Sequence, residues 1–113
     1  MALQISVREQ GDVTILDVAG ELNASGCPAL PQQVKQLLAL GKRKIAINLE
    51  EVTFIDSTGL GSLVASFTSA RSHNGALKLF SPNPVVHEAI QMTLLHRVIE
   101  THHREADALA SFG

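Results

Sequence analysis

The residues best placed to do chemistry lie in the segment Thr53-Phe54-Ile55-Asp56-Ser57-Thr58-Gly59-Leu60-Gly61. A short apolar run, Ile45 to Leu49, precedes this segment, and a helix-period pattern follows it. Ser57 is therefore expected where a strand and loop lead into a helix N-terminus. The first N–H groups of a helix have no partner inside the helix, and that end of the dipole is positive. A small hydroxyl there suits a helix cap, an anion site or a reversibly added phosphate.

Capping and phosphorylation have different consequences at Ser57. As a cap, Ser57, or Asp56 before it, contributes about 1 kcal/mol to helix stability. A phosphate on Ser57 instead adds a charge of about −1.5 to −2 beside the helix start. The helix N-terminus offsets part of this charge and Asp56 opposes it, so the surface potential changes while the fold survives. Such a change suits a switch in binding, and Thr58 is the second-choice acceptor.

Two glycines, Gly59 and Gly61, fall inside the helix pattern. They do not complete a dinucleotide-binding fingerprint, because Val64 occupies the third glycine position and both glycines lie inside the helix pattern rather than in the turn before it. Glycine also lets another surface approach the backbone closely. A smooth helix start rimmed by Ser62 and Ser66 therefore suggests either a docking face or a solvated helix face.

The other polar residues form no catalytic or metal-binding pattern. The carboxylates without a fixed catalytic spacing are Asp17, Glu50, Glu51 and Asp56, of which Glu50 and Glu51 resemble a solvated loop. The histidines without a ligand spacing are His73, His87, His96, His102 and His103. No Gly-x-Ser-x-Gly motif occurs, and Cys27 is interpreted as a small residue at a helix entry. The sequence predicts no enzyme activity, no metal and no cofactor.

Composition excludes several partner classes. The chain has 113 residues, of which 45% are hydrophobic, so it can bury a core. The net charge is −2, the aromatic content is 4%, and Trp and Tyr are absent, which argues against nucleic acid. The basic cluster Lys42-Arg43-Lys44 is interpreted as a helix-end and loop cluster that complements the dipole. With one cysteine, no signal peptide and no apolar run of membrane-spanning length, we expect a cytoplasmic protein without a membrane partner.

Hydrophobic periodicity predicts the elements that position Ser57. The predicted strands are Leu3–Val7, Val13–Ala19, Ile45–Leu49, Ala76–Phe80 and an edge strand at Arg97–Glu100. The predicted helix faces are Leu30, Val34, Leu37 and Leu38, then Leu60, Leu63, Val64 and Phe67, then Val86, Ala89 and Ile90, with a last helix at Glu105–Phe112. Gly11-Asp12 is predicted as a turn that joins the first two strands in a hairpin, and Gly20 to Gly26 as a polar loop. The alternation predicts one α/β domain over residues 1–113, with a mixed, mostly parallel sheet of four to five strands and about four helices.

Three segments of the chain resemble the STAS domain of bacterial anti-sigma factor antagonists. They are Val18-Ala19-Gly20-Glu21-Leu22-Asn23, then Ile47-Asn48-Leu49 with Val52-Thr53-Phe54-Ile55-Asp56-Ser57-Thr58-Gly59-Leu60, and then Gly75-Ala76-Leu77-Lys78-Leu79 with Pro84-Val85-Val86. The resemblance implies a sheet packed by helices. It also implies that Ser57 is phosphorylated by a partner serine kinase of ATPase-type fold, which is itself the anti-sigma factor. Unphosphorylated antagonist sequesters that kinase, phosphorylation releases it, and a serine phosphatase resets the cycle.

The chain departs from the family pattern at Asn23, where an aspartate is usual after Gly-Glu-Leu. The expected partner-binding residues are Asn23, Asp56, Thr58, Gly59, Gly61 and Ser62. The loss of charge at position 23 also motivates an alternative, a constitutive scaffold subunit of a signalling or transport assembly in which Ser57 is only a helix cap. Nucleotide or small-ligand binding at the Gly59 loop is a third class. The domain is expected to be a monomer or a weak dimer.

Overall fold

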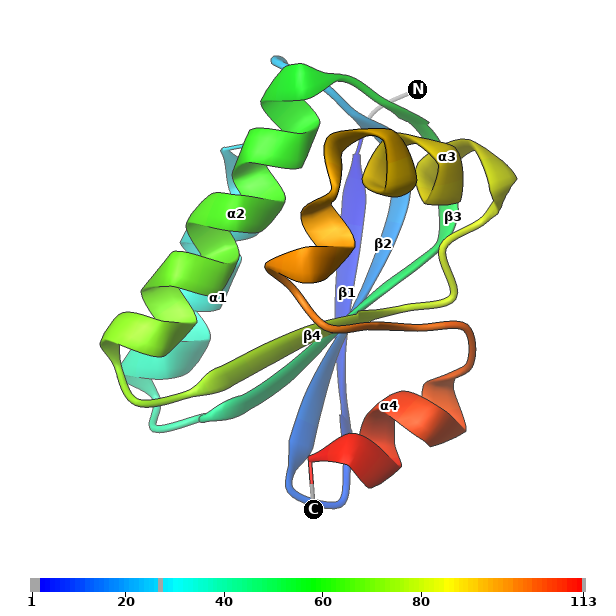
Figure 1. The fold of residues 1–113 in the computed structure, drawn as a ribbon. Coiled ribbons are helices and arrows are strands. Elements are labelled where there is room, and N and C mark those ends of the chain that lie inside the picture. Colours follow the sequence, from blue (N-terminus) through cyan, green and yellow to red (C-terminus); the bar gives the residue numbers. More distant parts are fainter. Residues whose placement is uncertain (1–2, 27, 113) are drawn as a thin grey trace.

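The computed structural model describes residues 3–26 and 28–112 of the chain, so the interpretation of Cys27 lies outside the described residues. Strands and helices alternate in the predicted order (Figure 1). The strands are β1 (Gln4–Gln10), β2 (Val13–Leu22), β3 (Lys44–Ile55), β4 (Ala76–Phe80) and β5 (Thr101–His102). The helices are α1 (Ala29–Ala39), α2 (Ser57–Ser72), α3 (Pro84–Thr93), the 3-10 helix η1 (Leu95–Arg97) and α4 (Glu105–Ser111). The predicted α/β fold class is confirmed.

The five strands form one sheet in the order β1-β2-β3-β4-β5. Strands β1 and β2 pair antiparallel across the predicted Gly11-Asp12 turn, where Gly11 has a φ of 64°. The pairs β2–β3, β3–β4 and β4–β5 are parallel. Because parallel strands end at the same edge, the segments that follow β2 and β3 lie side by side, and α1 and α2 begin there.

The sheet is covered on both faces. Helices α1, α2 and α3 pack on one face around a large apolar core that includes Leu16, Ile47 and Leu63 (Figure 1). The short helix α4 covers the other face, where Ala108 joins a smaller cluster with Ile15 and Phe80. Within the part of the chain that the structure describes, no helix has both the length and the apolar run that crossing a membrane requires.

Strands β2 and β3 both run further than the periodicity predicts. The segment Gly20–Leu22, predicted as loop, continues β2, and Leu22 is fully buried. Glu50 and Glu51, interpreted as a solvated loop, lie inside β3 with exposed side chains. The two strands continue because their backbones pair as far as Leu22 and Ile55. Backbone pairing therefore extends beyond the residues that show an apolar pattern. This pairing brings the ends of β2 and β3 together.

The predicted edge strand at Arg97–Glu100 is wrong. Residues Leu95–Arg97 form η1, and the edge strand is the later, two-residue β5. Helix α3 ends at Leu94, which adopts a left-handed conformation with a φ of 59°. Ile99 N then donates to Leu95 O at 2.9 Å, and both side chains are buried. A helical turn, and not a strand, therefore buries Leu95 and Ile99.

The predicted apolar face of α2 needs correction at Val64. Leu63 is fully buried, but Val64 is 37% exposed. Ser62 and Ser66 take its place in the interior, since both are buried and their hydroxyls donate to Gly59 O and Ser62 O within the helix. The buried face of α2 therefore consists of small residues and Leu63. Ser62 and Ser66 do not rim an exposed docking face.

An ion-pair cluster fastens α4 to the far face of the sheet. The Arg8 guanidinium contacts the Asp17 carboxylate at 2.6 Å and the Glu105 carboxylate at 2.7 Å. Asn48 Nδ2 also donates to Asp17 Oδ1 at 2.8 Å. The hydrogen bond from Arg8 is the main reason that the pKa of Asp17 lies below its usual value, and partial burial opposes it. Three strands and one helix therefore meet at these side chains.

We predict that Asp17→Asn lowers the free energy of unfolding by roughly 1 kcal/mol at neutral pH, the upper end for a partly exposed, solvent-screened pair. Because folding lowers the pKa of Asp17, its contribution is present at neutral pH and is lost as the pH falls through the folded pKa. Denaturant unfolding of parent and variant should therefore converge in acid. Asp12→Asn is the control, since Asp12 pairs with Lys44 but is 75% exposed. An equal loss in both variants, or a loss that persists in acid, would contradict this account.

Candidate functional site

Asp56 caps helix α2, and Ser57 is its first residue. The backbone of Asp56 is extended, and its Oδ1 accepts a hydrogen bond from Gly59 N at 2.9 Å. Asp56, and not Ser57, is therefore the residue that caps the helix. Ser57 and Thr58 follow as the first two residues of the helix, and both are exposed. The Ser57 hydroxyl is thus presented to solvent at a helix N-terminus without being needed as the cap.

The chain segments that meet around Ser57 carry no cationic side chain. No Lys or Arg occurs between Arg8 and Lys35, or between Lys44 and Arg71. These two stretches supply β2, the start of α1, nearly all of β3 and most of α2. Asp56 adds a carboxylate next to Ser57. An anionic group on Ser57 would therefore be offset mainly by the helix N-terminus.

The first turn of α2 lies directly against the end of β2. Asp56 N donates to Leu22 O at 3.4 Å. A Cβ atom on Gly59 would lie 2.0 Å from the same Leu22 oxygen, which no side chain tolerates. Gly61, by contrast, has open space where a Cβ atom would stand. Gly59 therefore permits a close approach within this chain, and Gly61 leaves the outer side of the helix smooth.

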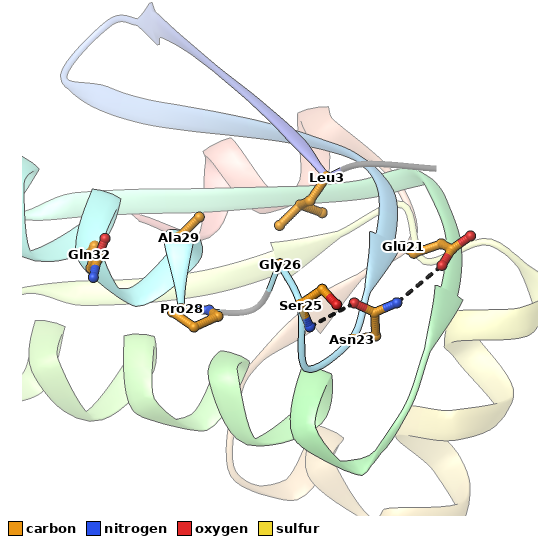
Figure 2. A pocket seen from close by; sticks show the side chains of 8 residues that line it. All are labelled: Leu3, Glu21, Asn23, Ser25, Gly26, Pro28, Ala29 and Gln32. Atoms are coloured by element: carbon orange, nitrogen blue, oxygen red, sulfur yellow. Dashed lines mark hydrogen bonds between the residues drawn. The ribbon is translucent and has the colours of Figure 1, made fainter.

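Asn23 follows Leu22 and is held by two hydrogen bonds of its side chain. Its Oδ1 accepts from Ser25 N at 3.1 Å, and its Nδ2 donates to Glu21 Oε1 at 3.0 Å (Figure 2). Since a backbone N–H can only donate, the bond to Ser25 fixes which end of the amide faces Glu21. An aspartate could accept from Ser25 N but could not donate to Glu21. The amide of Asn23 therefore makes one contact that an aspartate at this position could not make.

A pocket of about 530 Å³ opens beside this loop. Its lining residues are Leu3, Glu21, Asn23, Ser25, Gly26, Pro28, Ala29 and Gln32. Figure 2 shows Asn23 between Glu21 and Ser25, with Pro28, Ala29 and Gln32 coming from the start of α1. Glu21 is absent from the expected site residues, because Gly20 to Gly26 is predicted as a loop and Asn23 lies beyond the end of β2, where no strand period relates the two side chains.

The structure therefore brings most of the expected site together. Asn23, Asp56, Thr58 and Gly59 meet where β2, β3 and α2 join, beside Ser57. Ser62 does not join the surface, because it is 5% exposed and its hydroxyl bonds inside the helix. Burial follows from helix geometry, since Ser62 lies about one turn beyond the buried Gly59 on the same face.

The remaining candidate groups lie elsewhere. Asp17 is bound to Arg8, and Glu50 and Glu51 are exposed on β3. In the basic cluster, Arg43 Nη1 donates to Leu38 O near the end of α1 at 2.9 Å, so the helix-end interpretation holds for Arg43. Lys42 and Lys44 instead form ion pairs with Glu9 and Asp12. Within residues 3–26 and 28–112, no group of three or more His, Cys, Asp or Glu side chains is arranged to hold a metal ion.

Comparison with known proteins identifies relatives over almost the whole chain. A family model described as the STAS domain matches residues 4–108. The anti-sigma F factor antagonist of Paenibacillus polymyxa is 27% identical over 96% of this chain and 94% of its own length. The anti-sigma-B factor antagonist of Listeria monocytogenes is 29% identical over 95% and 93%. The crystal structure of an anti-sigma factor antagonist from Mycobacterium paratuberculosis superposes with a TM-score of 0.86, at 25% identity, over 96% of this chain and 92% of that one.

We predict opposite effects for the same substitution at the two glycines of α2. Gly59→Ala should destabilise the chain by roughly 2–3 kcal/mol, because the new methyl group collides with the Leu22 carbonyl. Gly61→Ala should stabilise it by about 0.5–1 kcal/mol through helix propensity, since nothing opposes the methyl group. Thermal and denaturant unfolding of both variants test the pair. Equal effects would show that α2 does not pack on β2 as described.

We also predict that Asn23→Asp loosens the loop after β2. The substitution replaces a donor with a carboxylate about 3 Å from the Glu21 carboxylate, a repulsive arrangement. Hydrogen exchange at Ser25 N should accelerate, and Glu21→Gln added to Asn23→Asp should slow it again. Unchanged exchange in Asn23→Asp would mean that the contact with Glu21 does not hold the loop.

Proposed function

Because the chain belongs to the STAS domain family, we propose that it is an anti-sigma factor antagonist whose binding is switched by phosphorylation of Ser57. In this proposal the unphosphorylated chain sequesters an anti-sigma factor that is also a serine kinase of ATPase-type fold. Phosphorylation of Ser57 releases that partner, and a serine phosphatase restores binding. The relatives named as anti-sigma factor antagonists support the regulatory role, which is binding and not catalysis.

The observation that carries the proposal is the division of roles between Asp56 and Ser57. Asp56 satisfies the helix N-terminus through Gly59 N, so the Ser57 hydroxyl has no capping task. Ser57 is exposed on the first turn of α2, where a kinase active site can reach it. A serine that capped the helix would lose its cap bond on modification, whereas modification of Ser57 leaves the cap in place.

The charges around Ser57 support a switch that acts on the surface. The helix N-terminus tolerates a phosphate, so the fold is retained. The segments that meet here contribute no Lys or Arg to pair with it, and Asp56 adds negative charge. The phosphate therefore remains exposed and strongly charged. A partner that packs closely on this edge would have to desolvate it, which opposes binding.

The exposed and half-buried residues near Ser57 define the surface that a partner can contact. Thr58 and Gly61 are exposed on α2, and Asn23 and Asp56 are half-buried at the ends of β2 and β3. Gly59 contributes indirectly, by letting the first turn of α2 lie against Leu22. In this proposal Gly61 lets the partner approach the helix closely, so Gly61→Ala weakens binding although it stabilises the free chain.

The switch is tested with Ser57→Ala, Ser57→Asp and the control Thr68→Asp. Thr68 is an exposed hydroxyl residue on the same face of α2, three turns and about 16 Å from Ser57. We predict that Ser57→Ala retains an ATPase-type kinase from lysate of the native host. Ser57→Asp should lose at least about ten-fold in affinity, or about 1.4 kcal/mol, while Thr68→Asp binds like the parent. Captured proteins are identified by mass spectrometry, and affinities are then measured with the purified kinase.

Two results would reject the proposal. The first is equal binding of the kinase by Ser57→Ala and Ser57→Asp. The second is a stable partner without kinase homology whose binding ignores both substitutions, which would favour the constitutive scaffold subunit. Asn23 motivates that alternative, but its bond to Glu21 gives the residue a local role that needs no scaffold partner.

A further inference from the structure

Four of the five histidines gather around one pocket, far along the chain from Ser57. The pocket has a volume of about 250 Å³. Its imidazoles come from four places, which are α3 (His87), η1 (His96), β5 (His102) and the residue after β5 (His103). The other lining residues are Ile90, Gln91, Glu100 and Thr101. The spacing of the histidines in the sequence does not indicate this cluster, because its members come together only through the fold of the 94–101 segment.

Two of the imidazoles, those of His87 and His103, have a separation that fits a shared metal ion. The ring centres of His87 and His103 are 5.6 Å apart, and the planes are tilted by 39°. Two imidazoles that ligate one Zn²⁺ have ring centres about 5–6 Å apart, because each zinc–nitrogen bond is about 2.0–2.1 Å long. The separation of the His87 and His103 rings is therefore compatible with ligation of the same ion.

The backbone that carries His103 is held in place beside the pocket. Ser81 N donates to His102 O at 2.9 Å, and Ser81 Oγ donates to His103 O at 3.2 Å. On the other side, His87 N donates to Asn83 O in the first turn of α3. Both ligand candidates thus come from anchored segments, which lowers the entropy cost of binding an ion between them.

The other two imidazoles supply further features of a metal site. His96 Nδ1 is buried and has no hydrogen-bond partner in the part of the chain that the structure describes. His102 Nε2 lies 2.5 Å from Glu100 Oε2, the carboxylate–histidine contact that commonly orients a metal-ligating imidazole. Imidazole nitrogen suits Zn²⁺, Cu²⁺ and Ni²⁺.

We propose that this histidine-lined pocket binds one divalent transition-metal ion, with His87 and His103 as its first two ligands. No three candidate side chains among the described residues are yet arranged around a single point. Water, or His96 or His102 after a change of rotamer, therefore completes the coordination shell. The ion would tie α3 to the segment between β5 and α4. This site is independent of Ser57 and of the function proposed for it.

The test is calorimetric titration of the full, untagged, chelator-treated chain with Zn²⁺ and, separately, with Co²⁺. We expect one ion per chain and a metal-dependent rise in the melting temperature that a chelator reverses. His87→Gln and His103→Gln should each weaken binding by at least about ten-fold, the smallest effect usual even for a partner of a metal ligand. His73→Gln is the matched control, because His73 follows α2 and does not line the pocket.

Any of three other outcomes would contradict the proposed metal site. Absence of binding heat and of a thermal shift for both ions excludes it. Equal weakening by His73→Gln shows unspecific surface binding, and unchanged binding in His87→Gln and His103→Gln places the ion elsewhere. Melting of each variant in chelator confirms that the fold is intact, so loss of binding is not loss of structure.

Discussion

The close contact between the first turn of α2 and the end of β2 is the constraint on which the site depends. Gly59 lies so near the Leu22 carbonyl that no side chain fits between them. The ends of β2 and β3 lie side by side at this contact, because Leu22 pairs with Ile55. The Leu22 carbonyl also accepts a hydrogen bond from Asp56 N, which leads into α2. The residue after β2, Asn23, and the first residue of α2, Ser57, consequently lie at the same edge of the sheet.

At the same junction, the residues that stabilise the structure differ from Ser57, the residue proposed to be phosphorylated. Asp56 caps the helix, Gly59 permits the packing, and the buried hydroxyls of Ser62 and Ser66 are satisfied inside α2. Ser57 is left exposed, and stability does not require its hydroxyl. In the proposed function, a phosphate on Ser57 therefore leaves the cap bond of Asp56 and the buried face of α2 in place. Modifiable residues are most useful where a rigid element presents them in this way.

The C-terminal third of the chain is organised differently from the site. Leu94 ends α3 in a left-handed conformation, η1 turns the chain, and only two residues pair in β5. Backbone pairing is sparse here, so side chains carry more of the packing, as with Lys78, which donates to Ser111 and contacts Glu100. The histidines gather in this region. Their proximity depends on how α3, η1 and β5 pack together, which no sequence periodicity indicates.

The sequence alone determined the features that depend on neighbours within a few residues. It established the element order, the hairpin at Gly11-Asp12, and a capped helix start that presents Ser57, because caps, turns and periodicity are local signals. Tertiary structure decided which serine is exposed, since Ser57 and Ser62 differ only in the side of α2 that meets the core. It also decided the length of β2 and β3, the bond between Asn23 and Glu21, and the gathering of the histidines. Burial and long-range proximity arise when separate elements pack together, and no short window of sequence contains that information.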